Sequence, residues 1–229
     1  MTLGVMQPYF LPYIGYFQLI KLVDLYVIAD DVNYIMKGWI NKNNILANGV
    51  AQRFHIDIKG ASPNKWINEL SVADDQRKFI KSIEYNYKKA PYYNDVFPII
   101  ERIINYEDKN LARYVGNSII QIAEYLNFDT EFRYESDIDC NRSLKGQERL
   151  ISDCVLLGAK KYINAIGGME LYDKDMFREA GVELLFLKSK QVEYKQFGKA
   201  FVPNLSIVDV LMFNSVEEIN QLLLSFELI

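Results

Sequence analysis

Residues 1–31, MTLGVMQPYFLPYIGYFQLIKLVDLYVIADD, predict the fold of this chain. The apolar run Leu3–Met6 indicates a short buried strand, and the spacing over Gly15–Val23 indicates a helix. Leu25–Ala29 is a second apolar run that ends at two aspartates. A strand, a helix and a second strand in this order form a βαβ unit, whose strands run parallel. We therefore expect an α/β protein with a parallel, Rossmann-like sheet at its core.

A long helical segment interrupts this alternating pattern. From about residue 74 to residue 127, apolar residues recur every three or four positions, which predicts about three helices inserted in, or packed on, the α/β core. The elements expected downstream are a strand near Thr130–Tyr134, a helix that ends at Gly158, a strand and turn at 161–168, a helix at 171–181, a strand at 182–188 and a pair of helices within 200–229. We expect one domain that spans residues 1–229.

Composition and charge narrow the function classes. The chain has 229 residues, half of them hydrophobic, and a net charge of -4, which disfavours electrostatic binding of nucleic acid. Its two cysteines, Cys140 and Cys154, form no metal motif and no disulfide framework, as in a cytoplasmic protein. Gln7, Pro8 and Pro12 interrupt the first apolar run, so we expect neither a signal peptide nor a membrane span.

The turns after three predicted strands suggest a binding site. In parallel α/β sheets, ligands bind beyond the carboxyl ends of the strands, near the point where the strand order reverses. The candidate ligand-binding residues in these turns are Gln7, Tyr9, Tyr13 and Tyr16, then Asp30 and Asp31, and finally Gly167 and Gly168. Each has a plain alternative, because aromatic residues often pack rigid loops and a pair of acids at a strand end is often a solvated loop. Glycines likewise serve ordinary turns.

The segment DDVNYIMKGWINKNNIL, residues 30–46, is the second candidate. Its polar and aromatic candidates are Lys37, Trp39, Asn41, Lys42 and Asn43. An exposed or pocket-lining indole is suited to stacking on a sugar or base, and amides are suited to reading the edges of that ring. The alternative is that the asparagines only shape turns.

Other candidates for chemistry are isolated. Lys145 and Arg149 lie four residues apart, which suits a phosphate or carboxylate clamp at a helix start or a solvated helix face. His55 alternates with apolar neighbours on a half-buried strand, with Asp57 too far along that strand for a simple pair. We expect it to be a surface residue without a catalytic role.

Two further residues have structural interpretations. Cys154 falls in the apolar stripe of its helix, whereas Cys140 falls in a polar loop with no neighbouring histidine. Ser206 and Asp209 have the spacing of a helix cap and its acidic partner.

The chain resembles the WbqC-like protein family. The resemblance rests on QPYFLPYIGYFQLI, DDVNYIMKGWINKNNIL, NYKKAPYY, LKGQERLI, LGAKKYINAIGG and FVPNLSIVDVLM, which together span most of the sequence. It implies a cytoplasmic bacterial protein that is encoded with genes for surface polysaccharide, typically O-antigen. It also implies transfer of an acyl or amino-acyl group onto an amino sugar. Lys42 and Asn44 depart from the pattern, because relatives tend to have arginines there, and this weakens bidentate anion binding.

Three functions remain open at this stage. The first is a transferase that acts on a small molecule, a nucleotide-linked or amino sugar, for which the sequence identifies neither a catalytic residue nor a cofactor. The second is a non-catalytic protein that binds a nucleotide sugar or organises partner enzymes. The third is nucleotidyl transfer, since the first turn is similar to that of nucleotidylyltransferases. Tyr13 and Tyr16 replace the usual histidines there and are neutral at pH 7, which argues against that reaction.

Overall fold

A computed structural model describes residues 1–73, 75–198 and 200–229. The strands of its main sheet are β1 (Thr2–Met6), β2 (Leu25–Ile28), β7 (Glu131–Tyr134), β8 (Lys161–Ala165), β9 (Glu183–Ser189) and β10 (Phe226–Leu228). The helices are α1 (Ile14–Leu22), α2 (Arg77–Tyr87), α3 (Tyr93–Ile104), α4 (Leu111–Tyr125), α5 (Gly146–Leu156), α6 (Lys174–Glu179), α7 (Ile207–Phe213) and α8 (Val216–Leu222). Among the described residues, no helix is both long and apolar enough to cross a bilayer.

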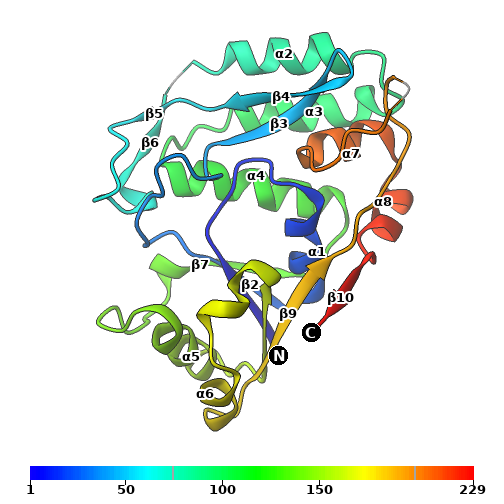
Figure 1. Cartoon of the computed structure of the whole chain (residues 1–229). Helices are drawn as coiled ribbons and strands as arrows, with labels where there is room; N and C mark the ends of the chain where they lie inside the picture. Colours follow the sequence, from blue (N-terminus) through cyan, green and yellow to red (C-terminus); the bar gives the residue numbers. More distant parts are fainter. Residues whose placement is uncertain (74, 199) are drawn as a thin grey trace.

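The main sheet is parallel except at one edge, which confirms the expected α/β fold. Its strand order is β10-β9-β8-β1-β2-β7, and only β10 runs antiparallel to its neighbour. The chain leaves β1 towards β2 and β7, then returns to the other side of β1 for β8 and β9 (Figure 1). The strand order therefore reverses between β1 and β8, and this is where such sheets bind ligands.

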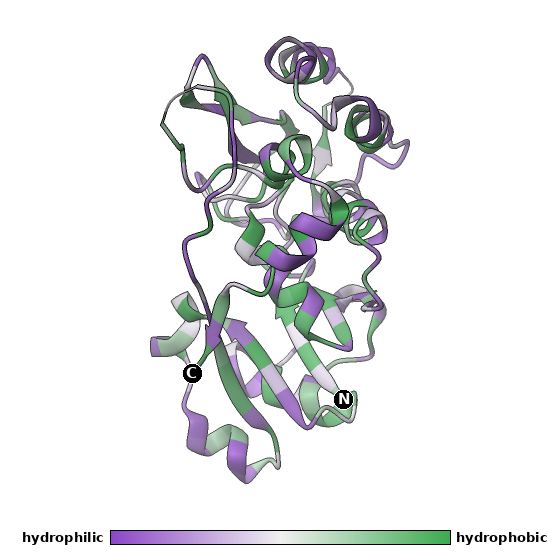
Figure 2. Ribbon diagram, turned by 90° about the vertical axis from the view of Figure 1, so that its right-hand side faces the viewer, coloured by the Kyte–Doolittle hydropathy of each residue, from purple (hydrophilic) through white to green (hydrophobic). Residues whose placement is uncertain are grey.

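Alternating side chains hold helices on both faces of the sheet. Leu3, Val5 and Val27 face one side, where they pack in a cluster with Cys154 of α5 and Phe177 of α6. Residues of the opposite parity, such as Tyr26 of β2, pack on the other side with α1 and the larger core. In Figure 2, green hydrophobic stretches alternate with paler and purple ones along the strands.

The segment between β2 and β7 forms an insertion of strands and helices. It contains β3 (Lys42–Ala47), β4 (Val50–His55), β5 (Ile58–Lys59), the 3₁₀ turn η1 (Ile67–Glu69), β6 (Ser71–Val72) and α2 to α4. The three helices confirm the predicted helical segment, although Asp74, where the prediction began, lies outside the described residues. The insertion lies above the sheet in Figure 1. It closes its first hairpin with Asn48 and Gly49, both at positive φ, as two-residue hairpin turns require.

Three of the described strands, β3, β6 and β10, were not predicted from the sequence. Strand β3 begins with the polar residues Lys42, Asn43 and Asn44, which we had interpreted as a recognition segment, and it pairs in antiparallel register with β4. Strand β10 follows the pair of C-terminal helices and pairs only with the edge strand β9. The helix expected at 171–181 is also shorter, because residues up to Leu171 belong to a 3₁₀ turn, η3 (Ile166–Leu171).

Candidate functional site

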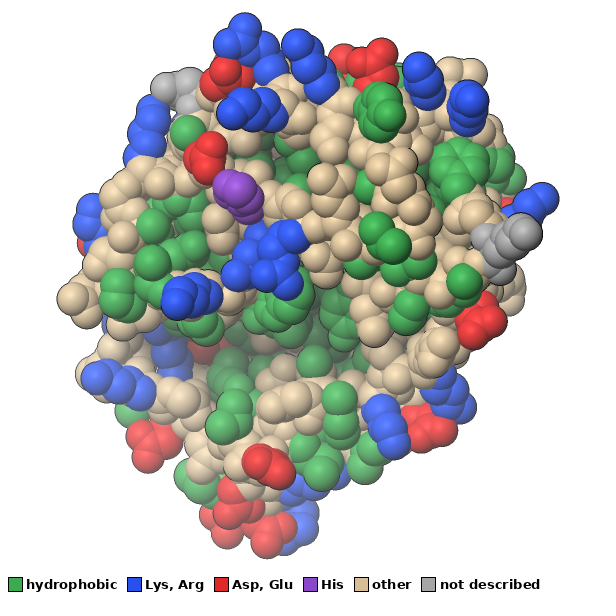
Figure 3. All heavy atoms as spheres, turned by 45° about the horizontal axis from the view of Figure 1, so that its top comes forward, with side chains coloured by type: hydrophobic (Ala, Val, Ile, Leu, Met, Phe, Trp, Pro, Cys, Tyr) green, Lys and Arg blue, Asp and Glu red, His purple; other side chains and the backbone are tan. Residues whose placement is uncertain are grey.

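A cleft of about 850 Å³ lies at the carboxyl ends of β1, β2 and β8, at the reversal of strand order. The predicted residues on its wall are Gln7, Tyr9, Asp31, Lys145, Arg149, Gly167 and Gly168. The space-filling view shows the surface hollowed between the insertion above and the sheet below (Figure 3). Three segments that are far apart in the sequence therefore meet in one cavity, as the strand-end argument predicted.

The two aspartates that follow β2 are buried, so the interpretation as a solvated loop is wrong. The side chain of Asp31 is 1% exposed and accepts hydrogen bonds from Arg142 Nε at 3.0 Å and Arg149 Nη2 at 2.6 Å. Asp30 accepts from the backbone N–H and the hydroxyl of Ser136 at 2.8 and 2.6 Å. In the part of the chain that the structure describes, no three His, Cys, Asp or Glu side chains are arranged to hold a metal ion.

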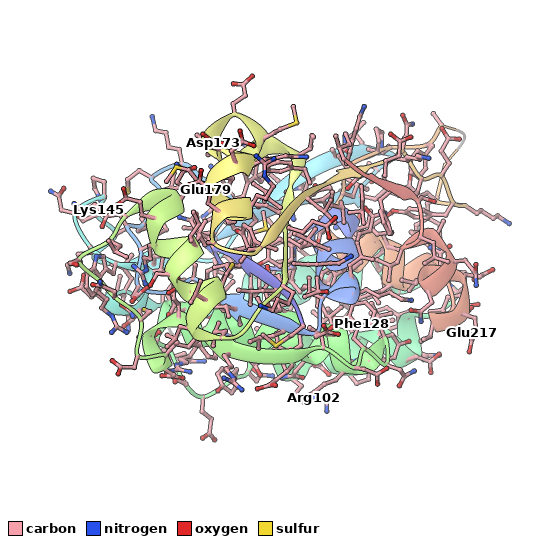
Figure 4. The ribbon with its side chains drawn as sticks, turned by 90° about the horizontal axis from the view of Figure 1, so that it is seen from below. Arg102, Phe128, Lys145, Asp173, Glu179 and Glu217 are labelled. Atoms are coloured by element: carbon pink, nitrogen blue, oxygen red, sulfur yellow. The ribbon has the colours of Figure 1, made fainter. Side chains whose placement is uncertain are left out.

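Arg149 is occupied within the wall of the cleft. Its Nη2 lies 2.6 Å from Asp31 Oδ1 and 2.8 Å from Glu135 Oε1, so its charge is balanced by two carboxyl groups. Lys145 has a different position, because it is exposed where α5 begins and lies at the periphery of the molecule in Figure 4. Of the predicted pair, only Lys145 has a charge that faces solvent at the rim.

Glu135 was not identified from the sequence. It follows β7 in the 3₁₀ turn η2 (Glu135–Asp137), lines the cleft and is 3% exposed. Burial raises its pKa to about 8, Arg149 opposes that shift, and the carboxylates of Asp31 and Asp153 add to it. Glu135 follows a predicted strand at the carboxyl edge of the sheet, and this position could have identified it as a site residue. The surrounding sequence ESDID, however, is typical of an acidic surface loop.

A second pocket of about 340 Å³ adjoins the cleft, and Tyr9 lines both. Its other lining residues are Pro12, Tyr13, Trp39, Asn43, Asn44 and Asn204. The Trp39 side chain is 47% exposed, and the Arg53 guanidinium lies 5.7 Å from its ring centroid. Aromatic faces with amides between them suit a planar or sugar ring. The predicted residues Tyr13, Trp39 and Asn43 therefore meet here.

The stiff aromatic turn after β1 separates these two cavities. Leu11 has a positive φ of 47°, and its carbonyl accepts hydrogen bonds from Asn43 Nδ2 at 2.9 Å and the Ser206 hydroxyl at 2.7 Å. Phe10 is fully buried, with ring centroids of Phe54 and Phe79 about 6 Å away, so this side chain does pack the loop. The packing of Phe10 and the hydrogen bonds to the Leu11 carbonyl therefore hold the turn around its strained residue, Leu11. Tyr9 and Tyr13 remain at the surface.

The remaining predicted residues line neither cavity, and each has a contact within the protein. Tyr16 is buried and donates to the Gln7 carbonyl at 2.8 Å, which supports the turn from behind. Asn41 accepts from the Tyr34 hydroxyl at 3.1 Å and donates to the Ile56 carbonyl at 2.9 Å. Lys42 donates through Nζ to the Lys37 carbonyl at 2.6 Å.

The two glycines after β8 differ in their surroundings. A Cβ on Gly168 would lie 3.0 Å from the Asn164 amide and 3.0 Å from the Tyr172 ring, whereas a Cβ on Gly167 would meet nothing within 4 Å. Gly168 is therefore needed for close packing beneath the cleft, while Gly167 leaves open space beside it.

His55 and the cysteines lie outside both cavities. His55 is exposed and its Nε2 lies 3.2 Å from Asp57 Oδ1, so the expectation that Asp57 is too distant was wrong. Strand β4 ends at His55, so Asp57 lies beyond the strand rather than along it. Cys154 is core, as predicted, and Cys140 lies in a loop, as predicted, but its side chain is buried there. Burial raises the pKa of both thiols, which makes them poor nucleophiles.

Comparison with known proteins places this geometry in a family. An uncharacterized protein of Mycobacterium tuberculosis (strain ATCC 25618 / H37Rv), Rv1507c, is 26% identical over 216 residues, which is 92% of each chain. No solved structure matches. The model of the WbqC-like protein family matches residues 7–221, which include the turn after β1, the insertion, and strands β2 and β8 beside the cleft. The chain belongs to the WbqC-like protein family.

Proposed function

We propose that this protein is a cytoplasmic transferase of bacterial surface-polysaccharide (O-antigen) biosynthesis that joins an acyl or amino-acyl group to a nucleotide-linked amino sugar. Family membership is one support, because the resemblance implies this setting. The observation that carries the proposal is the cleft at the reversal of strand order, which has the size of a small-molecule site and adjoins a second pocket across Tyr9.

The start of α5 supports an anionic group in the ligand. Lys145 is the N-cap residue of this helix, and no side chain caps the helix start. Uncapped backbone N–H groups and the positive end of the helix dipole favour a phosphate, and the exposed ammonium of Lys145 adds a compact cation. A nucleotide sugar contains a diphosphate that matches this rim.

The second pocket supports a ring at the other end of the ligand. Trp39 and Tyr13 present partly exposed aromatic surface, and Asn43 and Asn44 add amides beside it. A nucleotide base stacked on Trp39 would place the diphosphate and the sugar towards the cleft, with Tyr9 between the two subsites. The ligand would then occupy both cavities.

A non-catalytic nucleotide-sugar-binding or scaffold protein is the second candidate. It is favoured by one observation: the cleft wall, as far as the structure describes it, holds neither histidine nor cysteine and so no Ser-His-Asp or Cys-His arrangement. A transferase without a nucleophile must rely on positioning and proton transfer. Binding alone does not separate the two candidates, so turnover has to be measured.

Binding is tested with UDP-N-acetylglucosamine by calorimetry and thermal shift. Lys145→Ala should weaken binding about tenfold, because it removes a charge-assisted contact to phosphate. Lys160→Ala is the matched control, since Lys160 is exposed just before β8, at the opposite edge of the sheet. If both variants bind UDP-N-acetylglucosamine with equal affinity, Lys145 does not contact its phosphates. If the wild type does not bind this ligand at all, the proposal is contradicted.

Turnover is tested with UDP-glucosamine and acetyl-CoA, followed by mass spectrometry of the sugar nucleotide. Formation of the N-acyl product above the uncatalysed rate would support the transferase. Tight binding of UDP-glucosamine without product, across a panel of acyl and amino-acyl thioesters, would favour the non-catalytic candidate.

A further inference from the structure

The buried charged cluster behind the wall of the cleft contains more carboxyl groups than cations, while Lys145 lies apart from it at the exposed rim. Asp31 and Glu135 share one guanidinium, that of Arg149, and Arg142 supplies a second cation to Asp31. Asp153 of α5 lies behind Glu135, is 3% exposed, and neither of its carboxyl oxygens receives a hydrogen bond from any described donor. With every group ionised, this cluster would therefore have one uncompensated negative charge.

A proton between two carboxyl groups resolves this imbalance when the cleft is empty. Two acceptor-only carboxylates cannot bond to each other, whereas a protonated carboxyl donates to its neighbour. Burial also favours the neutral form, and the pKa of Glu135 is raised to about 8 with Asp153 among the causes. Glu135, which lines the cleft, is the member of the pair that a ligand can reach.

The groups that face Glu135 come from every neighbouring element. They are Asp30 and Asp31 after β2, Arg149 and Asp153 on α5, Tyr162 on β8, and Cys140 in the loop after η2, from which Arg142 pairs with Asp31. Asp30 is hydrogen-bonded only to neutral donors, so it adds to the negative charge. The buried groups around Glu135 therefore favour an added cation at this carboxyl over an added anion, whereas the exposed rim at Lys145 favours an anion.

The cation that fits is an ammonium rather than a metal. The described side chains form no group that could hold a metal ion. The Glu135 carboxyl pairs with one arginine, Arg149, among the described residues. An amine offers protons to carboxylate oxygens in hydrogen-bonding geometry and needs no further ligand. The site thus matches the amino group of the substrate class proposed above.

We propose that Glu135 is the residue of the cleft that binds the amine of an amino-sugar substrate and takes its proton. This assignment rests on the proposed function. The ammonium of the sugar gives one proton to the Glu135 carboxylate, and the free amine nitrogen attacks the carbonyl carbon of an acyl thioester. A C–N bond forms, the C–S bond breaks, and the departing thiolate takes the second proton that the nitrogen loses. Asp153 is a positioning residue that holds the shared proton when the cleft is empty.

Calorimetry with two sugar nucleotides tests the assignment on the whole chain. UDP-glucosamine carries an amine where UDP-glucose carries a hydroxyl, and at about pH 6 an amine of ordinary α-amino basicity is already an ammonium. The wild type should bind UDP-glucosamine about tenfold more tightly, because the contact to Glu135 is charge-assisted. Measured in two buffers of different ionisation enthalpy, that binding should release about one proton, since an ammonium lowers the pKa of a neighbouring carboxyl.

Two variants separate binding from proton storage. In Glu135→Gln, the amide keeps an acceptor for Arg149 and a donor for Asp153, so we expect this variant to fold. Its affinities for UDP-glucosamine and UDP-glucose should differ by no more than about twofold, and binding should release no proton. In Asp153→Asn, the new amide donates to an ionised Glu135, so the preference should remain while proton release disappears.

The outcomes distinguish this assignment from the proposed function. Equal binding of the two sugar nucleotides by the wild type, or an unchanged preference in Glu135→Gln, would overturn the assignment and leave a nucleotide-sugar site standing. Binding of neither would overturn both. If Glu135→Gln does not fold, Asp153→Asn decides. Unchanged proton release in this variant would overturn the assignment. Loss of proton release together with a retained preference for UDP-glucosamine would support it.

Discussion

At the scale of single residues, the charged groups of the cleft are unusual because they are removed from water. Asp31 forms an ion pair with Arg149, Glu135 lies against the same guanidinium, and both carboxyl groups are almost fully buried. Such pairs gain Coulomb energy but lose hydration, so each group depends on its partners for its protonation state. The cleft therefore differs from the exposed pairs of this protein, such as Arg77 with Asp75, which solvent screens.

Glu135 makes the stability of the fold depend on pH. Its folded-state pKa of about 8 lies above the ordinary value of 4.5, so between these values the folded chain holds a proton that the unfolded chain has lost. Stability should therefore fall as pH rises from about 4.5 to about 8, with a slope of up to about 1.4 kcal/mol per pH unit from this group.

Urea unfolding of wild type and Glu135→Gln over that range isolates this contribution. The glutamine variant should lose the slope, whereas Glu148→Gln, at an exposed glutamate of α5, should retain it. Parallel curves for wild type and Glu135→Gln would mean that Glu135 is ionised in the folded protein.

Trp39 tests the second pocket. Because its side chain is 47% exposed, Trp39→Ala should leave the melting temperature almost unchanged. Loss of stacking should weaken UDP-N-acetylglucosamine binding by about 1–3 kcal/mol, by analogy with base–aromatic stacking. Tyr85→Ala, at an exposed tyrosine of α2 that lines neither cavity, is the control. A large drop in melting temperature with unchanged affinity would make Trp39 a packing residue.

Asn41 is expected to behave in the opposite way. Its amide joins the Tyr34 hydroxyl to the Ile56 carbonyl and lines neither cavity. Asn41→Ala should lower the free energy of unfolding by about 1–3 kcal/mol, because it leaves these groups unpaired, and should leave the ligand affinity unchanged. Chemical denaturation and calorimetry on one preparation measure both, and a selective loss of affinity would restore Asn41 to the site.

At the scale of elements, α4 and β7 approach each other closely at one glycine. A Cβ on Gly116 would lie 2.3 Å from the Tyr134 hydroxyl oxygen and 2.9 Å from its ring carbons. The ring cannot easily move away, because the Arg113 guanidinium lies 3.8 Å from its centroid and pairs with Asp137 at 2.8 Å. This contact helps to set the position of β7, and hence that of Glu135 directly after it.

Gly116→Ala should therefore destabilise the protein despite the better helix propensity of alanine. Overpacking costs about 1–3 kcal/mol, which exceeds the propensity gain of about 1 kcal/mol. Tyr134→Phe in the same chain should restore part of the loss by removing the hydroxyl. Glu124→Ala, an exposed change on α4, is the control, and thermal unfolding is the measurement. A more stable Gly116→Ala would show that the sheet yields at this point.

At the scale of the whole molecule, one buried carboxylate connects the insertion to the C-terminal segment. Asp209 of α7 is fully buried and accepts from Tyr87 of α2 at 2.8 Å, Tyr194 at 2.8 Å and Gln196 at 2.6 Å. The Tyr87 hydroxyl in turn accepts from the Leu46 backbone N–H of β3 at 2.8 Å. Ser206 caps α7 as predicted, but Asp209 acts through these distant partners rather than as part of a local capping box.

Asp209→Ala should cost more than the loss of any one partner. It leaves three donors unpaired in the core, at about 1–3 kcal/mol each before relaxation, whereas Tyr194→Phe removes one hydrogen bond. Because the three contacts share one carboxylate, the effects of Tyr87→Phe and Tyr194→Phe should not add. Urea unfolding of the single and double variants measures this coupling, and strict additivity would show that the contacts are independent.

The sequence by itself determined the α/β class, the parallel strands and the edge where the cleft lies. Apolar runs of four or five residues, separated by helical spacing, permit little else, because such strands must be covered on both faces. The aromatic turn after β1 was also readable as a special segment, since its prolines and tyrosines follow the first strand directly.

Only the tertiary structure decided which polar residues share the cleft. Asp31 follows β2, Glu135 follows β7, and Arg149 and Asp153 lie on α5, and the order of the strands brings these elements together. The same holds for β10, whose partner β9 lies far from it in the sequence. Burial and ion pairing depend on such non-local contacts, and they determine whether an acidic residue is a solvated charge or holds a proton in the wall of a site.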